Sequence, residues 1–226
     1  MNKTAIISGA GGALGSEIVK KFQHAGYSIH GFYHSLPQSP GNESIHIHTV
    51  DLLDENTTKN EVENIFASES KVDVLVCTAG GFQVGNIEKT SVADLQKQFQ
   101  INFVTAYNLI RPVYNIMKRQ GYGRIFLIGS RQGDDARKSV NTIAYGLSKS
   151  LLFQLAEILN EDSKGKVVIS VIVPSTIDTK ANRESMPEAD FSKWVSPDDI
   201  ADIILFYSSS TTNAIRQPVI KIFGEG

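Results

Sequence analysis

The sequence contains a single cysteine, Cys77, which excludes an internal disulfide. Small secreted folds that rely on a disulfide framework are therefore excluded. No apolar run in the sequence approaches the roughly 20 residues that a helix needs to cross a bilayer. The opening Met-Asn-Lys-Thr leads directly into an apolar strand, without the longer apolar stretch and cleavage site of a signal peptide. We therefore expect a cytoplasmic protein with no membrane partner.

The sequence also lacks an excess of either charge. Lysine and arginine total 22 and aspartate and glutamate total 24, which gives a formal net charge of −2. Nucleic-acid-binding domains usually carry a basic excess, and acidic tails are typical of interaction segments. Neither is present, so we expect a small-molecule substrate and no nucleic-acid partner.

Short β-branched runs alternate with longer helical patterns along the whole chain. This alternation is typical of β-α-β units, in which a parallel sheet is covered on both faces. At 226 residues and 41% apolar composition, the chain fits one domain with one sizeable core. The predicted strands are 3–8, 28–33, 45–50, 72–77, 123–129, 167–173 and 217–223, and the predicted helices are 14–25, 54–68, 91–118, 143–160 and 197–207.

Three residues mark helix ends in this pattern, and one segment has little periodicity. Asp54 and Ser91 are predicted N-caps, and Gly26 is predicted to end the first helix. The segment 175–196, which contains Pro187, is the longest irregular stretch. We interpret it as a lid over a substrate site.

A glycine-rich turn follows the first predicted strand. Its residues are Ser8-Gly9-Ala10-Gly11-Gly12-Ala13-Leu14-Gly15, and the first amphipathic helix begins within it. Glycines let the backbone approach a pyrophosphate closely, and the first N–H groups of a helix are donors at a positive dipole end. The turn therefore predicts a dinucleotide-binding site.

Tyr145 and Lys149 lie four residues apart in the helical segment 143–160. At this spacing their Cβ atoms are roughly 5–6 Å apart on one helix face. A nearby cation favours the phenolate and lowers the pKa of a tyrosine, which makes it a better proton donor or acceptor. The spacing alone is also typical of an ordinary solvated pair, so its meaning depends on the rest of the sequence. The same helix is apolar on nearly every side, which predicts burial, either within one chain or against another subunit.

In their order along the chain these motifs resemble the short-chain dehydrogenase/reductase family. Ser8 to Gly15 match the family's glycine motif, with Ser8 in place of threonine and Ala13 in place of the middle glycine. Further matches are Asp51-Leu52, Cys77-Thr78-Ala79-Gly80, Asn102, Ile128-Gly129-Ser130 and the segment from Pro174 to Thr179. The resemblance covers almost the whole chain and implies one NAD(P)-binding Rossmann domain over residues 1–226. The implied α/β fold is doubly wound, with a seven-stranded, mainly parallel sheet and helices on both faces.

The resemblance implies NAD(P)H-dependent chemistry and assigns residues to it. Tyr145 would protonate the substrate, Lys149 would lower the pKa of Tyr145 and bind the nicotinamide ribose, Ser130 would orient the substrate, and Asn102 would hold a water linked to Lys149. The implied cofactor-binding residues are Gly9, Gly11, Gly12, Ala13, Leu14, Gly15, Tyr33, His34, Ser35, Asp51, Leu52, Ala79, Gly80, Gly81, Tyr145, Lys149, Pro174, Ile177 and Thr179.

The end of the second strand bears on the choice between NADP and NAD. An NAD-preferring enzyme usually has an acidic residue there that binds the ribose 2′-hydroxyl. Here the residues are Tyr33, His34 and Ser35, which suit a 2′-phosphate. NADP is therefore favoured, and NAD stays open because no arginine is present at this position.

Within the family the chain is most similar to dihydropteridine reductases, through residues 12–16, 77–81 and 182–194. This similarity predicts a small cyclic or aromatic carbonyl or quinonoid substrate, with a dihydropterin as the leading example. Two features depart from these reductases, because Ser130 stands where they carry alanine and the interval from Ser130 to Tyr145 is two residues longer. The candidates for a flat, apolar substrate wall are Phe82, Met186, Phe191 and Trp194, and packing in the core or the lid is the alternative for each.

Two other interpretations stay open. One is a general ketone or 3-ketoacyl reductase, which the hydroxyl of Ser130 favours. The other is a regulator that senses a dinucleotide without catalysis, which the intact Ser130, Tyr145 and Lys149 disfavour. The family resemblance also implies a homodimer or homotetramer.

Histidine and cysteine are the other residue types that could form a chemical site. His46 and His48 share one face of a predicted strand, but no third ligand stands at a useful spacing, so we predict no metal site. Cys77 is predicted to be a small packed residue that lines the nucleotide channel and not a nucleophile.

Overall fold

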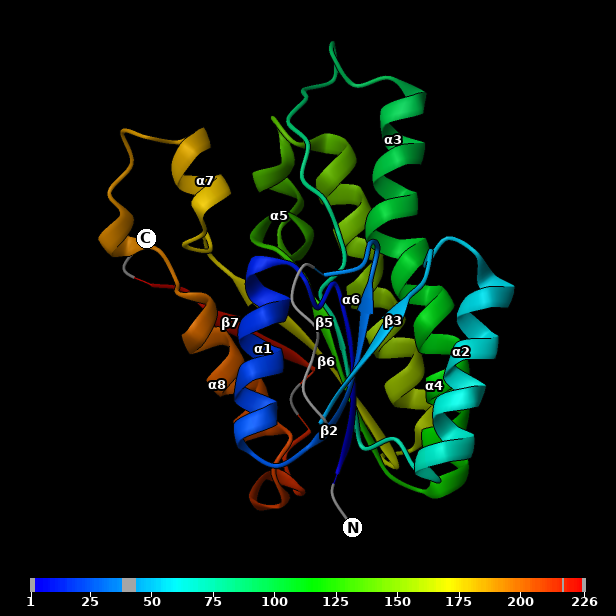
Figure 1. Cartoon of the computed structure of the whole chain (residues 1–226). Helices are drawn as coiled ribbons and strands as arrows, with labels where there is room; N and C mark the ends of the chain where they lie inside the picture. The colour runs from blue at the N-terminus through cyan, green and yellow to red at the C-terminus, as the bar shows by residue number, and fades with distance from the viewer. Residues whose placement is uncertain (1–2, 38–43, 217, 225–226) are drawn as a thin grey trace.

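The computed structural model describes residues 3–37, 44–216 and 218–224. They form one seven-stranded sheet in the order β3-β2-β1-β4-β5-β6-β7 (Figure 1). All six strand pairings are parallel, so the sheet is parallel throughout where the sequence predicts a mainly parallel one. The strands are β1 Thr4–Ser8, β2 Ser28–Tyr33, β3 Ile45–Thr49, β4 Val74–Cys77, β5 Gly123–Ile128, β6 Val167–Pro174 and β7 Val219–Ile222.

Each predicted strand is present within one or two residues of its expected bounds. The first residue of the predicted strand 217–223, Gln217, lies outside the described residues. Strands β1, β4, β5 and β6 are buried along their whole length, as expected for parallel strands covered on both faces.

Helices cover both faces of the sheet, and each layer encloses its own core (Figure 1). Helices α1 (Ala13–His24) and α8 (Pro197–Tyr207) pack on one face, where Phe22 and Ile200 are fully buried. Helices α2 (Glu55–Glu69), α4 (Thr105–Gln120) and α6 (Ile143–Ser163) pack on the other face. The remaining helices are α3 Val92–Phe99, α5 Arg131–Asp134 and α7 Lys180–Ser185.

The predicted helix ends are confirmed by their capping contacts. The Asp54 carboxylate accepts hydrogen bonds from the backbone N–H groups of Asn56 and Thr57. Ser91 and Asp94 form a reciprocal capping box at the start of α3. Gly26 follows α1 with φ of +79°, a left-handed conformation that favours glycine.

The predicted helix 91–118 is interrupted, which the sequence pattern does not show. A π-helical turn, Gln100–Val104, separates α3 from α4. Such a turn inserts one extra residue into the helix and is frequent at functional sites. Asn102 lies in this turn and is buried.

Helix α6 is not buried on all sides. Leu147 is 54% exposed and Ile158 is 64% exposed, although Leu152, Leu155 and Ala156 are buried. The interpretation that one chain alone buries this helix is therefore wrong. Among the described residues, no helix combines the length and the apolar character that crossing a membrane requires.

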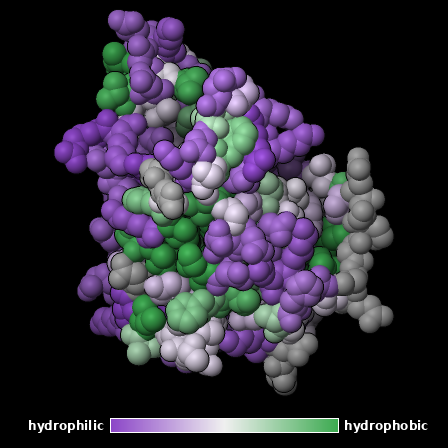
Figure 2. Space-filling model, turned by 90° about the vertical axis from the view of Figure 1, so that its left-hand side faces the viewer, coloured by the Kyte–Doolittle hydropathy of each residue, from purple (hydrophilic) through white to green (hydrophobic). Residues whose placement is uncertain are grey.

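Figure 2 shows the face that carries α8, where hydrophilic residues surround a central gathering of hydrophobic ones. The edge strand β7 lies at this end of the sheet, because it pairs only with β6. Phe206 on α8 and Phe223 after β7 are large exposed apolar side chains.

Four loops that carry predicted site residues begin at one edge of the sheet. Because the strands are parallel, the segments that follow β1, β4, β5 and β6 all leave at the carboxyl edge. The order reverses between β1 and β4, and ligands of doubly wound folds bind beside such a reversal. The fold thus brings the glycine-rich turn, Ser130 and Pro174 to the same edge.

Candidate active site

A cavity of about 620 Å³ lies at this carboxyl edge. Ser130 reaches it from the end of β5, Tyr145 from α6 and Pro174 from the end of β6. Its other lining residues are Phe82, Val84, Ile128, Gly129, Arg131, Gln132, Lys138, Ser175, Thr176, Ile177, Asn182, Ser185 and Met186. The structure therefore brings Ser130, Tyr145, Pro174 and Ile177, which the sequence places far apart, to one space.

The glycine-rich turn is packed too closely for side chains at two positions. Gly9 has φ of +62°, and a Cβ added there would lie 2.7 Å from Thr78 Oγ1. A Cβ added at Gly15 would lie 2.1 Å from the carbonyl oxygen of Gly9. Gly12 caps α1 without a side-chain hydrogen bond, and Gly11, Gly12 and Ala13 are exposed. The start of α1 is therefore open to a ligand, and the methyl group of Ala13 is accommodated.

The three residues at the end of β2 are not equivalent. The ring of Tyr33 packs under the glycine-rich turn, 3.2 Å from a Cβ position built on Gly11. Burial raises the pKa of the Tyr33 hydroxyl. His34 and Ser35 are exposed, so they are the two that a ligand at this edge can reach.

The segment after β3 is held by α4. Asn108 Nδ2 donates to the carbonyl oxygen of Leu52 (2.9 Å), and the Leu52 side chain is buried. The Asp51 carboxylate accepts a hydrogen bond from the backbone N–H of Leu53 (2.9 Å), and Asp51 is exposed. This arrangement presents the edge of the segment to solvent beside the switch point.

The Asn102 side chain joins three elements behind the cavity. Its Nδ2 donates to the carbonyl oxygen of Gly81 (3.0 Å), to Ser148 Oγ (3.1 Å) and to Gln98 Oε1 (2.9 Å). Its Oδ1 accepts from the backbone N–H of Gly81 (3.0 Å). The π-helical turn, the loop after β4 and α6 are thereby connected through one buried amide.

Gly80 separates Asn102 from Lys149. A Cβ added at Gly80 would lie 2.6 Å from Asn102 Oδ1 and 3.4 Å from Lys149 Nζ. Only a glycine leaves both groups in these positions. The structure therefore places Asn102, Gly80 and Lys149 in one cluster, as the family resemblance implies.

Lys149 is a buried cation. Its side chain lies on α6 and its Nζ donates to the carbonyl oxygen of Ile128 (2.7 Å). Burial lowers the pKa of Lys149 to about 8, because the ammonium loses hydration that one carbonyl does not replace. The neighbouring Cys77 is buried and burial raises its thiol pKa to about 12, so it is protonated and packed, consistent with the sequence analysis.

Tyr145 and Ser130 line the same cavity. Burial raises the pKa of Tyr145, the Ser130 side chain acts in the opposite direction, and the net change is upward. The expected lowering by Lys149 is not found, since its Nζ lies 6.0 Å from the centre of the Tyr145 ring and burial dominates. The Phe82 ring meets the Tyr145 ring edge-on, with 4.9 Å between centres.

The longer interval between Ser130 and Tyr145 is compactly folded. It contains α5 and a short 3₁₀ turn, Ala136–Ser139, and Ser130 Oγ caps α5 by accepting from the backbone N–H of Gly133 (3.1 Å). Two glycines bring this segment against α6: Cβ atoms added at Gly133 and Gly146 would lie 2.8 Å from Lys149 Cβ and 2.0 Å from Ser139 Oγ. The extra residues therefore do not displace Ser130 from Tyr145.

The segment 175–196 borders the cavity on one side. An isolated bridge between Ile177 and Val195 closes it at its base, and α7 lies within it. Thr179 caps α7, its Oγ1 accepting from the backbone N–H of Asn182 (3.2 Å). Met186, at the end of α7, lines the cavity.

Half of the predicted apolar wall is wrong. Phe82 and Met186 line the cavity, but Phe191 and Trp194 are not among its lining residues. These two rings pack against each other, with 4.8 Å between their centres, and the Arg183 guanidinium lies over Phe191. They stabilise the segment itself, because aromatic rings close in sequence can bury each other locally.

Several site residues were not predicted from the sequence. Ser148 and Gln98 accept hydrogen bonds from Asn102, and Arg131, Gln132 and Lys138 line the cavity. Gln98 stands four residues before Asn102, a spacing that indicates a shared helix face. No comparable signal points to the others, because their positions depend on how the interval after β5 folds.

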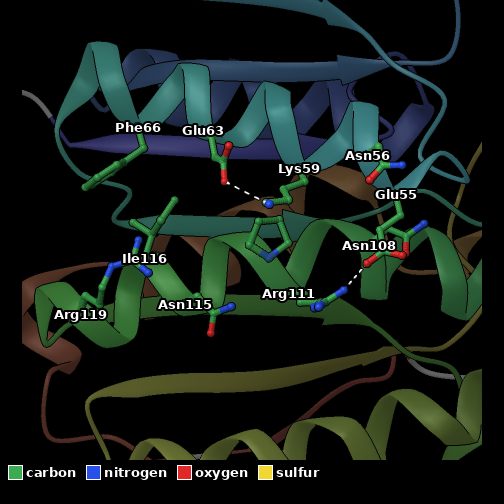
Figure 3. Close-up of a pocket in the computed structure, with 11 residues that line it drawn as sticks. Glu55, Asn56, Lys59, Glu63, Phe66, Asn108, Arg111, Asn115, Ile116 and Arg119 are labelled. Carbon is green, nitrogen blue, oxygen red and sulfur yellow. Dashed lines mark hydrogen bonds and ion pairs between the residues drawn. The ribbon is translucent and has the colours of Figure 1, made fainter.

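A second groove of about 530 Å³ lies between α2 and α4 (Figure 3). Two ion pairs lie in the groove, Arg111 with Glu55 across it and Lys59 with Glu63 along α2. None of the predicted site residues lines it. This groove is therefore separate from the candidate active site.

Comparison with known proteins agrees with this geometry. The family model described as short chain dehydrogenase matches residues 3–190. The chain belongs to the short-chain dehydrogenase/reductase family. As a member, it is an NAD(P)-dependent oxidoreductase, and its all-parallel, doubly wound sheet is the family fold.

Relatives and a solved structure align over nearly all of the chain. It is 26% identical to dihydropteridine reductase of Dictyostelium discoideum, covering 93% of this chain and 90% of that protein. It is also 26% identical to the 3-oxoacyl-[acyl-carrier-protein] reductase FabG of Rickettsia felis, covering 98% and 95%. The structure of ElxO with NADP bound superimposes with a TM-score of 0.90 at 21% identity, covering 98% and 97%. The last similarity concerns the fold.

Because α6 packs closely on the interval after β5, we predict that Gly146→Ala destabilises the wild type but not a Ser139→Gly variant. The Cβ of Gly146→Ala would lie 2.0 Å from Ser139 Oγ and 2.7 Å from Ser139 Cβ. We expect this variant to lose about 1–3 kcal/mol of unfolding free energy through overpacking. In a Ser139→Gly background the obstructing atoms are absent, and alanine is favoured over glycine in a helix interior. The same substitution should then be neutral or stabilising in urea unfolding. An equal loss in both backgrounds would contradict the packing described.

The buried ammonium of Lys149 predicts a pH-dependent stability change. Its folded pKa of about 8 lies below its ordinary 10.5, so below pH 8 the native chain carries a buried cation that the unfolded chain keeps in water. Lys149→Met should raise the unfolding free energy at pH 7, by up to about 3 kcal/mol. The gain should shrink as the pH rises from 8 towards 10.5, because the native lysine loses its proton first.

Urea unfolding without dinucleotide measures this difference. The matched control is Lys166→Met, since Lys166 is exposed and its substitution should change little at any pH. Destabilisation by Lys149→Met at pH 7, or a gain that does not vary with pH, would show that the ammonium is not the costly group.

Proposed function

We propose that this chain uses NADPH to reduce a small cyclic or aromatic carbonyl or quinonoid substrate, with a dihydropterin as the first substrate class to test. The observation that carries the proposal is that Ser130 and Tyr145 line the same cavity of about 620 Å³. Phe82 and Met186 line the same cavity and offer apolar surface to a flat ring. The similarity to a dihydropteridine reductase supports this substrate class.

The residues present fit a dinucleotide. Gly11, Gly12 and Ala13 are exposed at the start of α1, so the backbone there is open to close approach by a pyrophosphate. The pyrophosphate would lie on the first N–H groups of α1, the adenine beside Asp51 and Leu52, and the nicotinamide beside Pro174, Ile177 and Thr179. Ala79, Gly80 and Gly81 would form the channel wall between these ends.

The preference for NADP rests on the end of β2. His34 and Ser35 are exposed there and no carboxylate follows the strand, so a 2′-phosphate meets hydrogen-bonding groups and no like charge. The similar fold of ElxO holds NADP, which supports the same preference. NAD remains the alternative, because neither residue is an arginine.

The bound dinucleotide would supply a hydride to the substrate carbon. Tyr145 would give its proton to the substrate oxygen or nitrogen, and its raised pKa keeps the hydroxyl protonated at neutral pH until the substrate needs the proton. Ser130 would donate to the same substrate atom and orient it. Lys149 would hold the nicotinamide ribose and favour the Tyr145 phenolate after transfer. Asn102 would hold a water that returns a proton to Lys149.

Residues 175–196 would act as the lid. Met186 lies in this segment and lines the cavity, so its movement would change access to Tyr145. The Asp178–Arg183 ion pair and the Phe191–Trp194 contact would keep the segment ordered as it moves.

The second candidate is a general ketone or 3-ketoacyl reductase. The Ser130 hydroxyl favours this candidate, because a ketone oxygen needs such a hydrogen-bond donor. Dihydropteridine reductases carry alanine at the position of Ser130 and therefore lack this donor. Arg131 and Lys138 also line the cavity and would attract an anionic carrier. The similarity to a 3-oxoacyl-[acyl-carrier-protein] reductase supports the same candidate.

We also infer that the chain works as a homodimer or homotetramer in the cytoplasm. The exposed apolar side chains of Leu147 and Ile158 on α6 support self-association. Two independent two-fold interfaces generate a tetramer, and one alone generates a dimer. The cytoplasm is inferred from the single buried thiol and from the dinucleotide chemistry.

Removal of the proton donor tests the proposed chemistry. Tyr145→Phe should lower kcat/KM by about 10²–10⁴-fold, because it removes the general acid and leaves the ring packing against Phe82. The assay follows NADPH and NADH oxidation with quinonoid dihydropterin and a panel of ketones. Tyr107→Phe is the matched control, since Tyr107 is exposed on α4, and its activity should be unchanged.

The same assay separates the alternatives. Equal turnover by Tyr145→Phe and the wild type would reject Tyr145 as the acid. Turnover of ketones but not dihydropterin would favour the general ketone reductase. Tight NADPH binding without turnover of any substrate would favour the dinucleotide-sensing regulator.

A charge placed on the exposed face of α6 tests self-association. Ile158→Glu should reduce the mass measured by light scattering to that of a smaller assembly, because a carboxylate in an apolar interface loses its hydration. Asn60→Glu adds the same charge to an exposed position of another helix, α2, and should leave the mass unchanged. An unchanged mass for Ile158→Glu would exclude this face as an interface.

A further inference from the structure

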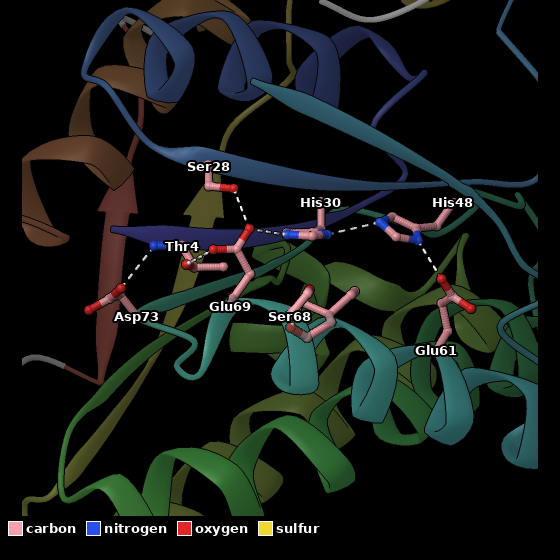
Figure 4. Close-up of polar contacts among 9 residues, drawn as sticks. Thr4, Ser28, His30, His48, Glu61, Ser68, Glu69 and Asp73 are labelled. Atoms are coloured by element: carbon pink, nitrogen blue, oxygen red, sulfur yellow. Dashed lines mark hydrogen bonds and ion pairs between the residues drawn. The ribbon is translucent and has the colours of Figure 1, made fainter. Parts of the chain in front are cut away.

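His30 and His48 lie together on the sheet face that α2 covers (Figure 4), and the His46 ring stacks on that of His30. The parallel register pairs His30 with His46 and Phe32 with His48, so the three imidazoles project from the same side of β2 and β3. The His30 and His46 rings are stacked, with 4.7 Å between centres and 18° between planes. His30 is buried and His46 is exposed. This cluster lies on elements that do not carry Tyr145.

Two carboxylates of α2 complete a linear chain of contacts. Glu61 Oε1 lies 2.5 Å from His48 Nδ1, His48 Nε2 lies 2.9 Å from His30 Nδ1, and His30 Nε2 lies 3.0 Å from Glu69 Oε1. Figure 4 shows this order from Glu61 to Glu69. All four nitrogen atoms of the two rings are therefore used in three contacts.

The chain of contacts requires one proton more than two neutral imidazoles hold. With both carboxylates ionised, each of the three contacts needs its own hydrogen, and each neutral imidazole supplies one. Two neutral imidazoles therefore leave one of the three contacts without a hydrogen, and that contact needs another positive partner.

A metal ion at the Glu69 end supplies this partner without a buried imidazolium. His30 Nε2 then binds the metal, its Nδ1–H donates to His48 Nε2, and His48 Nδ1–H donates to Glu61. Both imidazoles are neutral in this arrangement and every contact is satisfied. We propose that His30, His46 and Glu69 bind a divalent transition metal of the zinc type.

The positions of the three ligands suit such an ion. Their ligand atoms all lie within 4.8 Å of one another. Bonds of about 2.0–2.2 Å to a common zinc ion require somewhat shorter separations, which a shift of about 1–2 Å at the exposed His46 ring would provide. Imidazole nitrogen and carboxylate oxygen are ordinary zinc ligands, and two histidines with one glutamate leave a position for water.

The surrounding groups orient the ligands as in known metal sites. His48 and Glu61 fix the orientation of the His30 ring. Ser28 Oγ donates to Glu69 Oε1 (2.6 Å), and Thr4 Oγ1 donates to Glu69 Oε2 (3.3 Å). Such second contacts raise metal affinity, and their loss typically weakens it by about 10–100-fold. Sequence analysis found no third ligand because His30 and Glu69 lie far from His46 along the chain.

A shared proton is the competing occupant. An added proton would supply the third hydrogen of the chain and needs no ligand beyond it. A bound metal requires His46, whereas a shared proton does not. Replacement of His46 therefore distinguishes the two occupants. His46 is a ligand of the metal but takes no part in the chain from Glu61 to Glu69.

Zinc titration by calorimetry tests the proposal on the full chain after treatment with a chelator and its removal. We expect one equivalent of zinc to bind, with affinity at least about 10-fold weaker in His46→Ala and also weaker in Glu61→Ala, which removes the carboxylate that accepts from His48. His24→Ala is the matched control, because His24 is exposed at the end of α1, and its affinity should equal that of the wild type.

Thermal unfolding provides a second measurement. Zinc should raise the melting temperature of the wild type and of His24→Ala, and it should raise that of His46→Ala much less. Circular dichroism checks that each variant is folded, and the exposed position of His46 makes its replacement safe for the core. No stoichiometric binding by the wild type, or unchanged binding by His46→Ala, would overturn the proposal and leave the shared proton as the occupant.

Discussion

The buried amide of Asn102 is the contact on which the candidate active site depends. It belongs to a π-helical turn, and it ties the loop after β4 to α6 through Gly81 and Ser148. These two elements carry Ala79, Gly80 and Gly81, the proposed wall of a dinucleotide channel, and the Tyr145–Lys149 pair. A regular helix between α3 and α4 would rotate Asn102 away from them, because a π-helical turn adds a residue to the helical repeat. The irregularity in the helix therefore positions the site.

The close approach of backbone segments to α6 is the second constraint. It explains why the charged forms of Lys149 and Tyr145 are disfavoured in the chain without a ligand. Glycines at positions 80, 133 and 146 draw the surrounding segments against α6. The result is a space in which Lys149 meets one carbonyl oxygen and Tyr145 meets mainly Ser130. Burial moves the pKa values of both residues towards their neutral forms. A dinucleotide with its phosphates and ribose hydroxyls would supply polar partners to Lys149 and Tyr145. The free chain is therefore less stable than it would be with apolar residues at these positions, and the dinucleotide would bind more tightly.

Most of the fold was predictable because it depends on local patterns. Buried β-branched runs and the caps at Asp54 and Ser91 depend only on neighbouring residues. The π-helical turn was not predictable, since the apolar periodicity continues through it. Helix α5 is too short to be recognised from periodicity, and it lies in the longer interval between Ser130 and Tyr145.

The family resemblance located Asn102, Ser130, Tyr145 and Lys149, and their roles stay predictions. Phe191 and Trp194 were misplaced because a sequence does not show whether aromatic rings face a cavity or each other. The contact of His30 with Glu69 depends on strand register and on how α2 packs, which spacing along the chain does not reveal.

A crystal structure of the chain with NADPH tests the central claim most directly. The account predicts that the dinucleotide lies across the carboxyl edge of the sheet, with its pyrophosphate at the start of α1 and its nicotinamide beside Tyr145. Lys149 Nζ should then contact the ribose, and the Asn102 contacts to Gly81 and Ser148 should be unchanged. A dinucleotide bound elsewhere, such as in the groove between α2 and α4, or an Asn102 side chain turned away from both partners, would contradict the account.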